Sequence, residues 1–152
     1  MEMFCYQCEQ TAGGTGCTKF GVCGKDPATA ALQDLLVHAA KGIAQYAHRA
    51  AGLGARDREV DVFVVKALFT TLTNVNFDPQ RLGQWLAKAA AMRDRARKLY
   101  ESAAAKAGQK PEQLTGPSLW APAADLDGLV RQGKEVTIAK RLENLGPDVT
   151  GL

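Results

Sequence analysis

Four cysteines near the amino terminus are the residues of this chain best suited to chemistry. They are Cys5, Cys8, Cys17 and Cys23, separated by two, eight and five residues, and none occurs in the 129 residues that follow Cys23. A structural thiol can lie anywhere in a core, so four thiols within nineteen residues indicate one shared site. Thiolates of this kind are ligands of zinc and of iron–sulfur clusters.

The segment that carries the cysteines is also rich in glycine. Glycine lets the backbone approach a bulky group and adopt a positive φ, and successive backbone N–H groups can then point at an anionic centre. This composition favours a loop that wraps around a bound group. The glycines are Gly13, Gly14, Gly16, Gly21 and Gly24.

Four closely spaced cysteines are compatible with three kinds of chemistry. Disulfides suit small secreted proteins, but the start Met1–Cys5 has neither the basic nor the apolar part of a secretion signal. A structural zinc ion takes four thiolates. Zinc sites, however, usually show two pairs of the CxxC type, and here Cys17 and Cys23 are separated by five residues instead of two. An iron–sulfur cluster also takes four thiolates, and the uneven, glycine-rich spacing favours it over zinc.

The sequence around the cysteines resembles one protein family in particular. The matching stretches are MFCYQCEQTA at 3–12, GTGCT at 14–18 and GVCGK at 21–25, followed by 29–36, 41–44 and 72–78. They are similar to the amino-terminal part of the hybrid cluster proteins, also called prismane proteins or hydroxylamine reductases. The resemblance covers most of the chain.

That resemblance implies a cofactor and a role. It implies that Cys5, Cys8, Cys17 and Cys23 bind a [4Fe-4S] cluster near the surface, since the spacing is of the [4Fe-4S] type rather than the [2Fe-2S] type of some members. Members of the family reduce hydroxylamine to ammonia and water, or nitric oxide. They do so at a hybrid iron–sulfur–oxygen cluster held by later domains, whose cysteines this chain lacks.

The chain is therefore expected to be only the electron-input portion of such an enzyme. Its expected partners are an electron donor of unknown identity and, if the chain is a fragment, the rest of the hybrid cluster protein. The alternative from another class is a zinc-stabilised binding module without a redox role. On its own the chain is not expected to be a complete enzyme.

The remaining sequence predicts an all-α helical bundle that follows the cysteine loop. Apolar residues at helical spacing and cap signals predict helices from Asp26 to about Gly52, over 59–72 as a buried helix, from Asp78 to Gly108, and over 123–132 and 136–144. Gly42 inside the first helix predicts close packing against a neighbour. The expected divisions are 1–25 for the cluster loop, 26–108 for the bundle, and 109–152 for a loop and short helices that end where a second bundle would start, at Asp148.

Charge and composition exclude several other classes. With 46% hydrophobic and 23% charged residues the chain is expected to be globular, and no stretch is apolar enough for a membrane span. A net charge of +3 without aromatic–basic interleaving predicts no nucleic-acid partner, and the expected compartment is the cytoplasm. Residues 78–110 carry eight basic and three acidic residues, interpreted as a solvated face in preference to a docking patch. His38 and His48 are expected to be structural rather than metal ligands.

Overall fold

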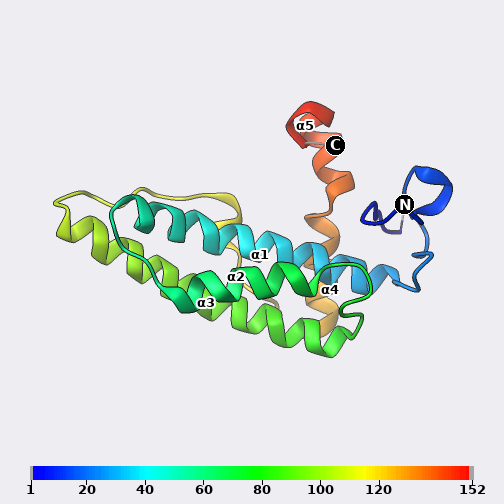
Figure 1. Cartoon of the computed structure of the whole chain (residues 1–152), viewed down its shortest axis with the longest axis horizontal. Helices are drawn as coiled ribbons and strands as arrows, with labels where there is room; N and C mark the ends of the chain where they lie inside the picture. The colour runs from blue at the N-terminus through cyan, green and yellow to red at the C-terminus, as the bar shows by residue number, and fades with distance from the viewer. Residues whose placement is uncertain (1, 151–152) are drawn as a thin grey trace. The chain divides into compact units, whose positions relative to one another are not determined.

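The computed structural model describes the backbone of residues 2–150 and the side chains of residues 2–141 and 143–146. The all-α prediction is confirmed, since the described residues contain one isolated β-bridge and no strand (Figure 1). Within that part of the chain, no helix has the length and apolar character needed to cross a membrane. The elements are η1 (Ala12–Gly14), α1 (Pro27–Gly52), α2 (Arg58–Thr70), α3 (Pro79–Lys106), η2 (Gly116–Leu119), α4 (Leu126–Glu135) and α5 (Ile138–Thr150).

These elements form two compact units, each assembled from segments that are distant in sequence. The first, called here the cysteine unit, comprises Met1–Leu35, Thr70–Gly83 and Ala123–Leu152. The second, the helical unit, comprises Leu36–Phe69 and Gln84–Pro122. The division of function expected at residues 25 and 108 stays a prediction.

Helix α1 begins where the sequence predicted. The side chain of Asp26 accepts a hydrogen bond from the backbone N–H of Thr29 at 2.6 Å, and Pro27 occupies the first helical position. An acidic cap satisfies a backbone donor that would otherwise lack an intrahelical partner. The stripe of α1 that carries the core consists of fully buried Leu32, Leu35, Leu36 and Ile43.

In the helical unit, α2 runs beside the portions of α1 and α3 that belong to this unit (Figure 1). The Tyr46 and Tyr100 rings are 6.4 Å apart, and the Phe63 and Trp85 rings are 5.3 Å apart, which are distances typical of packed aromatic pairs. The start of α2 is fixed by Asp57, whose carboxylate accepts hydrogen bonds from two backbone N–H groups of the first turn.

The expectation that the second helix is buried is wrong. Val60, Phe63 and Ala67 point into the core, Val64 is half-buried, and the other large apolar residues of this helix are exposed. The helical period explains this difference, because a helix that packs on one side buries only one stripe of its surface. The exposed set is Val62, Val65, Leu68 and Phe69.

The basic residues of α3 are partly neutralised within the helical unit. The guanidinium of Arg95 contacts Asp57 at 2.5 Å and also pairs with Glu59, and its hydrogen bond lowers the pKa of the Asp57 carboxyl below its usual value. Arg93 pairs with Asp94 and Arg97 with Glu101, each at 2.7 Å. These local pairs favour the interpretation of this helix as a solvated face.

The carboxyl-terminal helices differ from their predicted bounds. Helix α4 begins after Asp125, whose side chain accepts from the Gly128 N–H at 2.6 Å, and it continues through Gly133 instead of ending there. A Cβ at Gly133 would lie 2.1 Å from the backbone oxygen of Ala31, so this glycine permits close packing of α4 on α1. Helix α5 is kinked at Gly146, and the cap predicted at Asp148 falls on side chains outside the described residues.

Gly42 confirms the predicted close approach inside α1. A Cβ at this position would lie 2.3 Å from the backbone oxygen of Pro117, within the same unit. We expect Gly42→Ala to lower the free energy of unfolding by about 1–3 kcal/mol, because overpacking outweighs the gain in helix propensity. Denaturant titration measures this change.

Gly52→Ala is the matched control for that substitution, since it lies on the same helix and no atom is within 4 Å of the position that its Cβ would take. It should leave stability unchanged or raise it by up to about 1 kcal/mol. Equal effects of the two substitutions would contradict the packing argument.

Candidate metal centre

The cysteine loop is closed by a backbone pairing between two of the four cysteines. The Cys5 N–H donates to the Cys17 oxygen at 3.0 Å, and the Cys17 N–H donates to the Cys5 oxygen at 2.9 Å. The backbone N–H groups of Glu2 and Met3 both approach the Thr18 oxygen at 3.2 Å and extend this pairing. Eleven intervening residues are thereby folded back into one compact loop.

This loop is attached to the first turn of α1 by a small apolar cluster. Met3, Cys17 and Ala30 are buried together, and partly buried Cys5 packs against them. The cap at Asp26 sets where α1 begins and therefore where Ala30 stands. This apolar cluster therefore holds two candidate ligands, Cys5 and Cys17, against α1.

Cys17 has the surroundings of a sulfur that carries negative charge. Its Sγ accepts from the Ala12 N–H at 3.5 Å, contacts the Thr11 hydroxyl at 3.8 Å, and also accepts from the backbone of Val22. These hydrogen bonds, that of Ala12 above all, lower the pKa of the Cys17 thiol although its burial, at 4% exposed, acts in the opposite direction. Backbone donors directed at a thiolate are what a metal-binding loop requires.

The glycines of the loop provide both close contacts and positive φ angles. At Gly16, where φ is +119°, a Cβ would lie 2.6 Å from the Phe4 ring. At Gly21 it would lie 3.2 Å from the Cys23 Sγ. A tight turn holds this second position, since the Gly24 N–H donates to the Gly21 oxygen at 2.9 Å.

The structure brings the four predicted ligands into one loop but does not gather them around a point. All four are free thiols; Cys17 is buried and Cys5, Cys8 and Cys23 are half-buried. Over the described part of the chain, no three histidine, cysteine or acidic side chains form a group that could hold a metal ion. Which residues ligate a metal therefore stays a prediction.

Two residues of the site were missed by sequence reasoning. The Thr11 hydroxyl donates to the Cys5 oxygen at 3.1 Å, and the Lys25 Nζ lies 3.7 Å from the Cys5 Sγ. Nothing in the sequence singles out Thr11. Lys25 had a signal, since it follows the last cysteine closely in the matched stretch GVCGK, but its side-chain direction could be found only in the fold.

Apolar side chains are exposed beside the cysteines. Tyr6 is 58% exposed, Phe20 is 56% exposed and Val22 is 60% exposed, and each lies within three residues of a cysteine. Exposed apolar groups that gather at one place often mark an interaction surface. The charges of the same loop balance, with Glu2 and Glu9 against Lys19 and Lys25.

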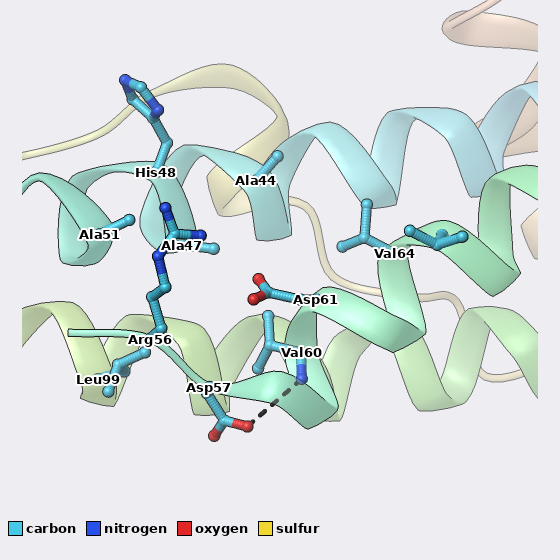
Figure 2. A pocket seen from close by; sticks show the side chains of 11 residues that line it. Ala44, Ala47, His48, Ala51, Arg56, Asp57, Val60, Asp61, Val64 and Leu99 are labelled. Carbon is cyan, nitrogen blue, oxygen red and sulfur yellow. Dashed lines mark hydrogen bonds between the residues drawn. The ribbon is translucent and has the colours of Figure 1, made fainter.

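A separate hollow lies within the helical unit; His48, Asp57 and Asp61 are among its lining residues, but over the described residues no three such side chains form a group that could hold a metal ion. Alanine and valine side chains of α1 and α2 line it, and Figure 2 shows Arg56 and Asp61 reaching into it while His48 points away. His48 is exposed and His38 half-buried on α1, and their expected role stays a prediction. The cysteine loop thus remains the candidate site.

The donor set of the loop fits a thiolate-bound metal centre. Four unoxidised thiols are available, and one of them already accepts backbone hydrogen bonds through its sulfur. An iron–sulfur cluster and a structural zinc ion both use four such ligands. The chemistry of the donors therefore allows either group.

Comparison with known proteins shows which family the chain resembles. The model of the Prismane/CO dehydrogenase family matches residues 3–148. A hydroxylamine reductase of Rhodospirillum rubrum is 53% identical over 150 residues, which are 99% of this chain and 27% of that protein. A hydroxylamine reductase of Acidithiobacillus ferrooxidans is 52% identical over 98% of this chain and 28% of its own length. The chain thus spans about a quarter of the length of these relatives.

A substitution at Gly16 tests how the loop protects Cys17. We expect Gly16→Ala to displace Phe4 and to loosen the backbone pair of Cys5 and Cys17, so that Cys17 becomes accessible. Alkylation of the metal-free chain, followed by mass spectrometry, should show Cys17 reacting several-fold faster than in the unsubstituted chain.

Gly14→Ala is the control, because it also places a Cβ at a positive φ, +69°, but no atom lies within 4 Å of its Cβ position. If both variants accelerate the alkylation of Cys17 equally, backbone strain alone would account for the effect, and the contact with Phe4 would be irrelevant.

Proposed function

The chain belongs to the Prismane/CO dehydrogenase family, and we propose that it is the electron-input part of a larger hydroxylamine reductase. Support comes from relatives of that name that are about 50% identical over almost the whole chain. The larger protein would reduce hydroxylamine to ammonia and water, or nitric oxide to nitrous oxide. This chain would bind a cluster and pass electrons onward.

The observation that carries the proposal is the state of Cys17. Its sulfur is buried and accepts backbone N–H hydrogen bonds, in a loop whose other three cysteines are also free thiols. A thiol that served only as an apolar core residue would not require donors directed at its sulfur. Metal ligation accounts for both the donors and the close spacing of all four cysteines in the sequence.

We assign Cys5, Cys8, Cys17 and Cys23 as the ligands of a [4Fe-4S] cluster. Bound there, the cluster would supply one-electron transfer. Cys5 and Cys17 would be held by their backbone pair, and the Ala12 and Val22 N–H groups would stabilise the negative charge on Cys17. Cys8 and Cys23 lie on the more exposed segments and would move to complete the set. Free thiols of this kind are consistent with the reducing cytoplasm.

The electron donor would dock on the apolar surface of the loop. Tyr6, Phe20 and Val22 are exposed within three residues of the proposed ligands, so a donor that covers them would come close to the cluster. The basic helix α3 supports this role less well, because Arg93, Arg95 and Arg97 are engaged in local ion pairs. The remainder of the longer protein would be the second partner and receive the electrons.

A zinc-stabilised binding module is the second candidate. Four thiols with one sulfur already hydrogen-bonded would also suit a tetrahedral zinc ion. Metal and sulfide analysis of the anaerobically purified chain distinguishes the two: iron with equal acid-labile sulfide supports the cluster, and one zinc without sulfide supports the module.

Replacing one proposed ligand should destroy the whole site. Because ligation couples the four thiols, Cys17→Ser should lose the cluster or convert it to a smaller one, seen as a fall in iron and acid-labile sulfide per chain. Thr18→Ser, an exposed neighbour, is the control and should retain both. Unchanged stoichiometry and absorption spectrum in Cys17→Ser would refute the assignment of this ligand.

The isolated chain should not reduce hydroxylamine at the rate of a full-length relative. Substrate reduction needs an open metal position, and the four cysteines that the chain possesses would all be ligands of the cluster. An anaerobic assay with reduced viologen tests this prediction. Ammonia production comparable to that of a full-length hydroxylamine reductase, and abolished by Cys5→Ser, would show that the catalytic centre lies in this chain.

A further inference from the structure

Lys25 is a buried lysine without an acidic partner. It is 2% exposed, although lysine is almost never fully buried unless its charge is paired. None of the described carboxylates forms an ion pair with it. The fold therefore holds a cation in its interior without an obvious balancing charge.

The contacts of the Lys25 ammonium are with the cysteine loop and with neutral groups. Its Nζ lies 3.7 Å from the Cys5 Sγ and 3.3 Å from the Gln7 Oε1, to both of which it can donate. It also lies 5.8 Å from the centre of the Phe77 ring, within the range of a cation–π contact. All four residues belong to the cysteine unit.

The backbone fixes the lysine in this position. The Lys25 oxygen accepts from the Gly21 N–H at 2.8 Å, and the next residue, Asp26, caps α1. The lysine thus stands between a tight turn and a helix start, and its side chain has little freedom to leave. A charge held in a buried place costs free energy unless an opposite charge accompanies it.

We propose that Lys25 is the internal counter-ion of the thiolate-bound metal centre. The inference rests on the proposed function only in that the four cysteines bind a metal as a set. Four thiolates carry more negative charge than a [4Fe-4S] core or a zinc ion carries positive charge, so the bound centre is an anion. The ammonium beside Cys5 offsets that charge inside the loop.

This role predicts opposite effects of removing the charge on the stability of the metal-free chain and on metal binding. In the metal-free chain the cation lacks its partner, so removing it should leave the fold as stable as before or make it more stable. In the metal-bound chain the cation is paired, so removing it should weaken metal binding. It should also make reduction of the cluster harder, because reduction adds a further negative charge. A residue that served only for packing would lower stability and metal affinity together.

The experiment compares three variants of the full 152-residue chain. Lys25→Met removes the charge and keeps an apolar chain of similar length, and Lys25→Arg keeps the charge. Lys19→Met removes an exposed charge from the same loop and is the matched control. Urea unfolding of the metal-free chains, Co²⁺ titration followed by thiolate-to-metal absorption, and redox titration of the reconstituted cluster provide three readouts.

We expect Lys25→Met to retain or gain stability without metal and to bind Co²⁺ at least tenfold more weakly. The midpoint potential of its cluster should be more negative by about 59 mV. For a one-electron couple this shift corresponds to a tenfold change in the ratio of oxidised to reduced protein. Lys25→Arg and Lys19→Met should stay within about threefold of the unsubstituted chain in Co²⁺ affinity.

Three results would overturn the inference. Unchanged Co²⁺ affinity and potential in Lys25→Met would show that the charge has no role. Equal damage in Lys25→Arg would show that shape matters instead of charge. Loss of the metal-free fold in Lys25→Met, and again in a further variant, Lys25→Gln, would show that the cation is needed before any metal binds.

The two proposals can fail separately. If the unsubstituted chain binds Co²⁺ but never acquires iron and sulfide, the electron-transfer proposal fails while the Co²⁺ titration still tests Lys25. If the cluster forms normally and Lys25→Met has no effect on it, only the counter-ion inference fails.

Discussion

The backbone pair between Cys5 and Cys17 is the constraint on which the cysteine unit depends. It consists of two hydrogen bonds, yet closing the loop turns the Ala12 N–H group, which lies inside it, toward the Cys17 sulfur. It also sets Cys17 against Met3 and Ala30, and so joins an irregular segment to a long helix. A mostly irregular loop, which contains the short η1 (Ala12–Gly14), is thereby closed at both ends.

Glycine determines how closely the helices of each unit can pack. In the helical unit, Gly42 receives the carbonyl of Pro117, and in the cysteine unit, Gly133 receives the carbonyl of Ala31. In both places a methyl group would overlap a backbone atom, which cannot move as a side-chain end can. Such contacts fix how the segments pack against one another as strictly as the apolar core does, although they bury little surface area. They also show why glycine is tolerated inside a helix despite its low helix propensity.

The sequence was informative where a signal was local. The Asp26–Pro27 start, the helical class and the tight packing at Gly42 all follow from residue types and spacing, and the family follows from the cysteine block. Burial of α2 could not be predicted, because its residues are apolar on nearly every side and only tertiary packing shows that Val60 and Phe63 face inward. The direction of Lys25 and the hydrogen bonds at Cys17 depend on loop closure, which has no periodic pattern to indicate it.

Because the cysteine unit is assembled from three segments that are far apart in sequence, it can be completed only after the last of them has been synthesised. The cysteines leave the ribosome first, whereas Gly133, which packs on Ala31, emerges 110 residues after Cys23. At bacterial or eukaryotic elongation rates this delay is on the order of ten seconds. During that interval the nascent chain presents four thiols without the helix that later covers the start of α1. The proposed cluster, if inserted during this interval, would meet a cysteine unit that is still incomplete.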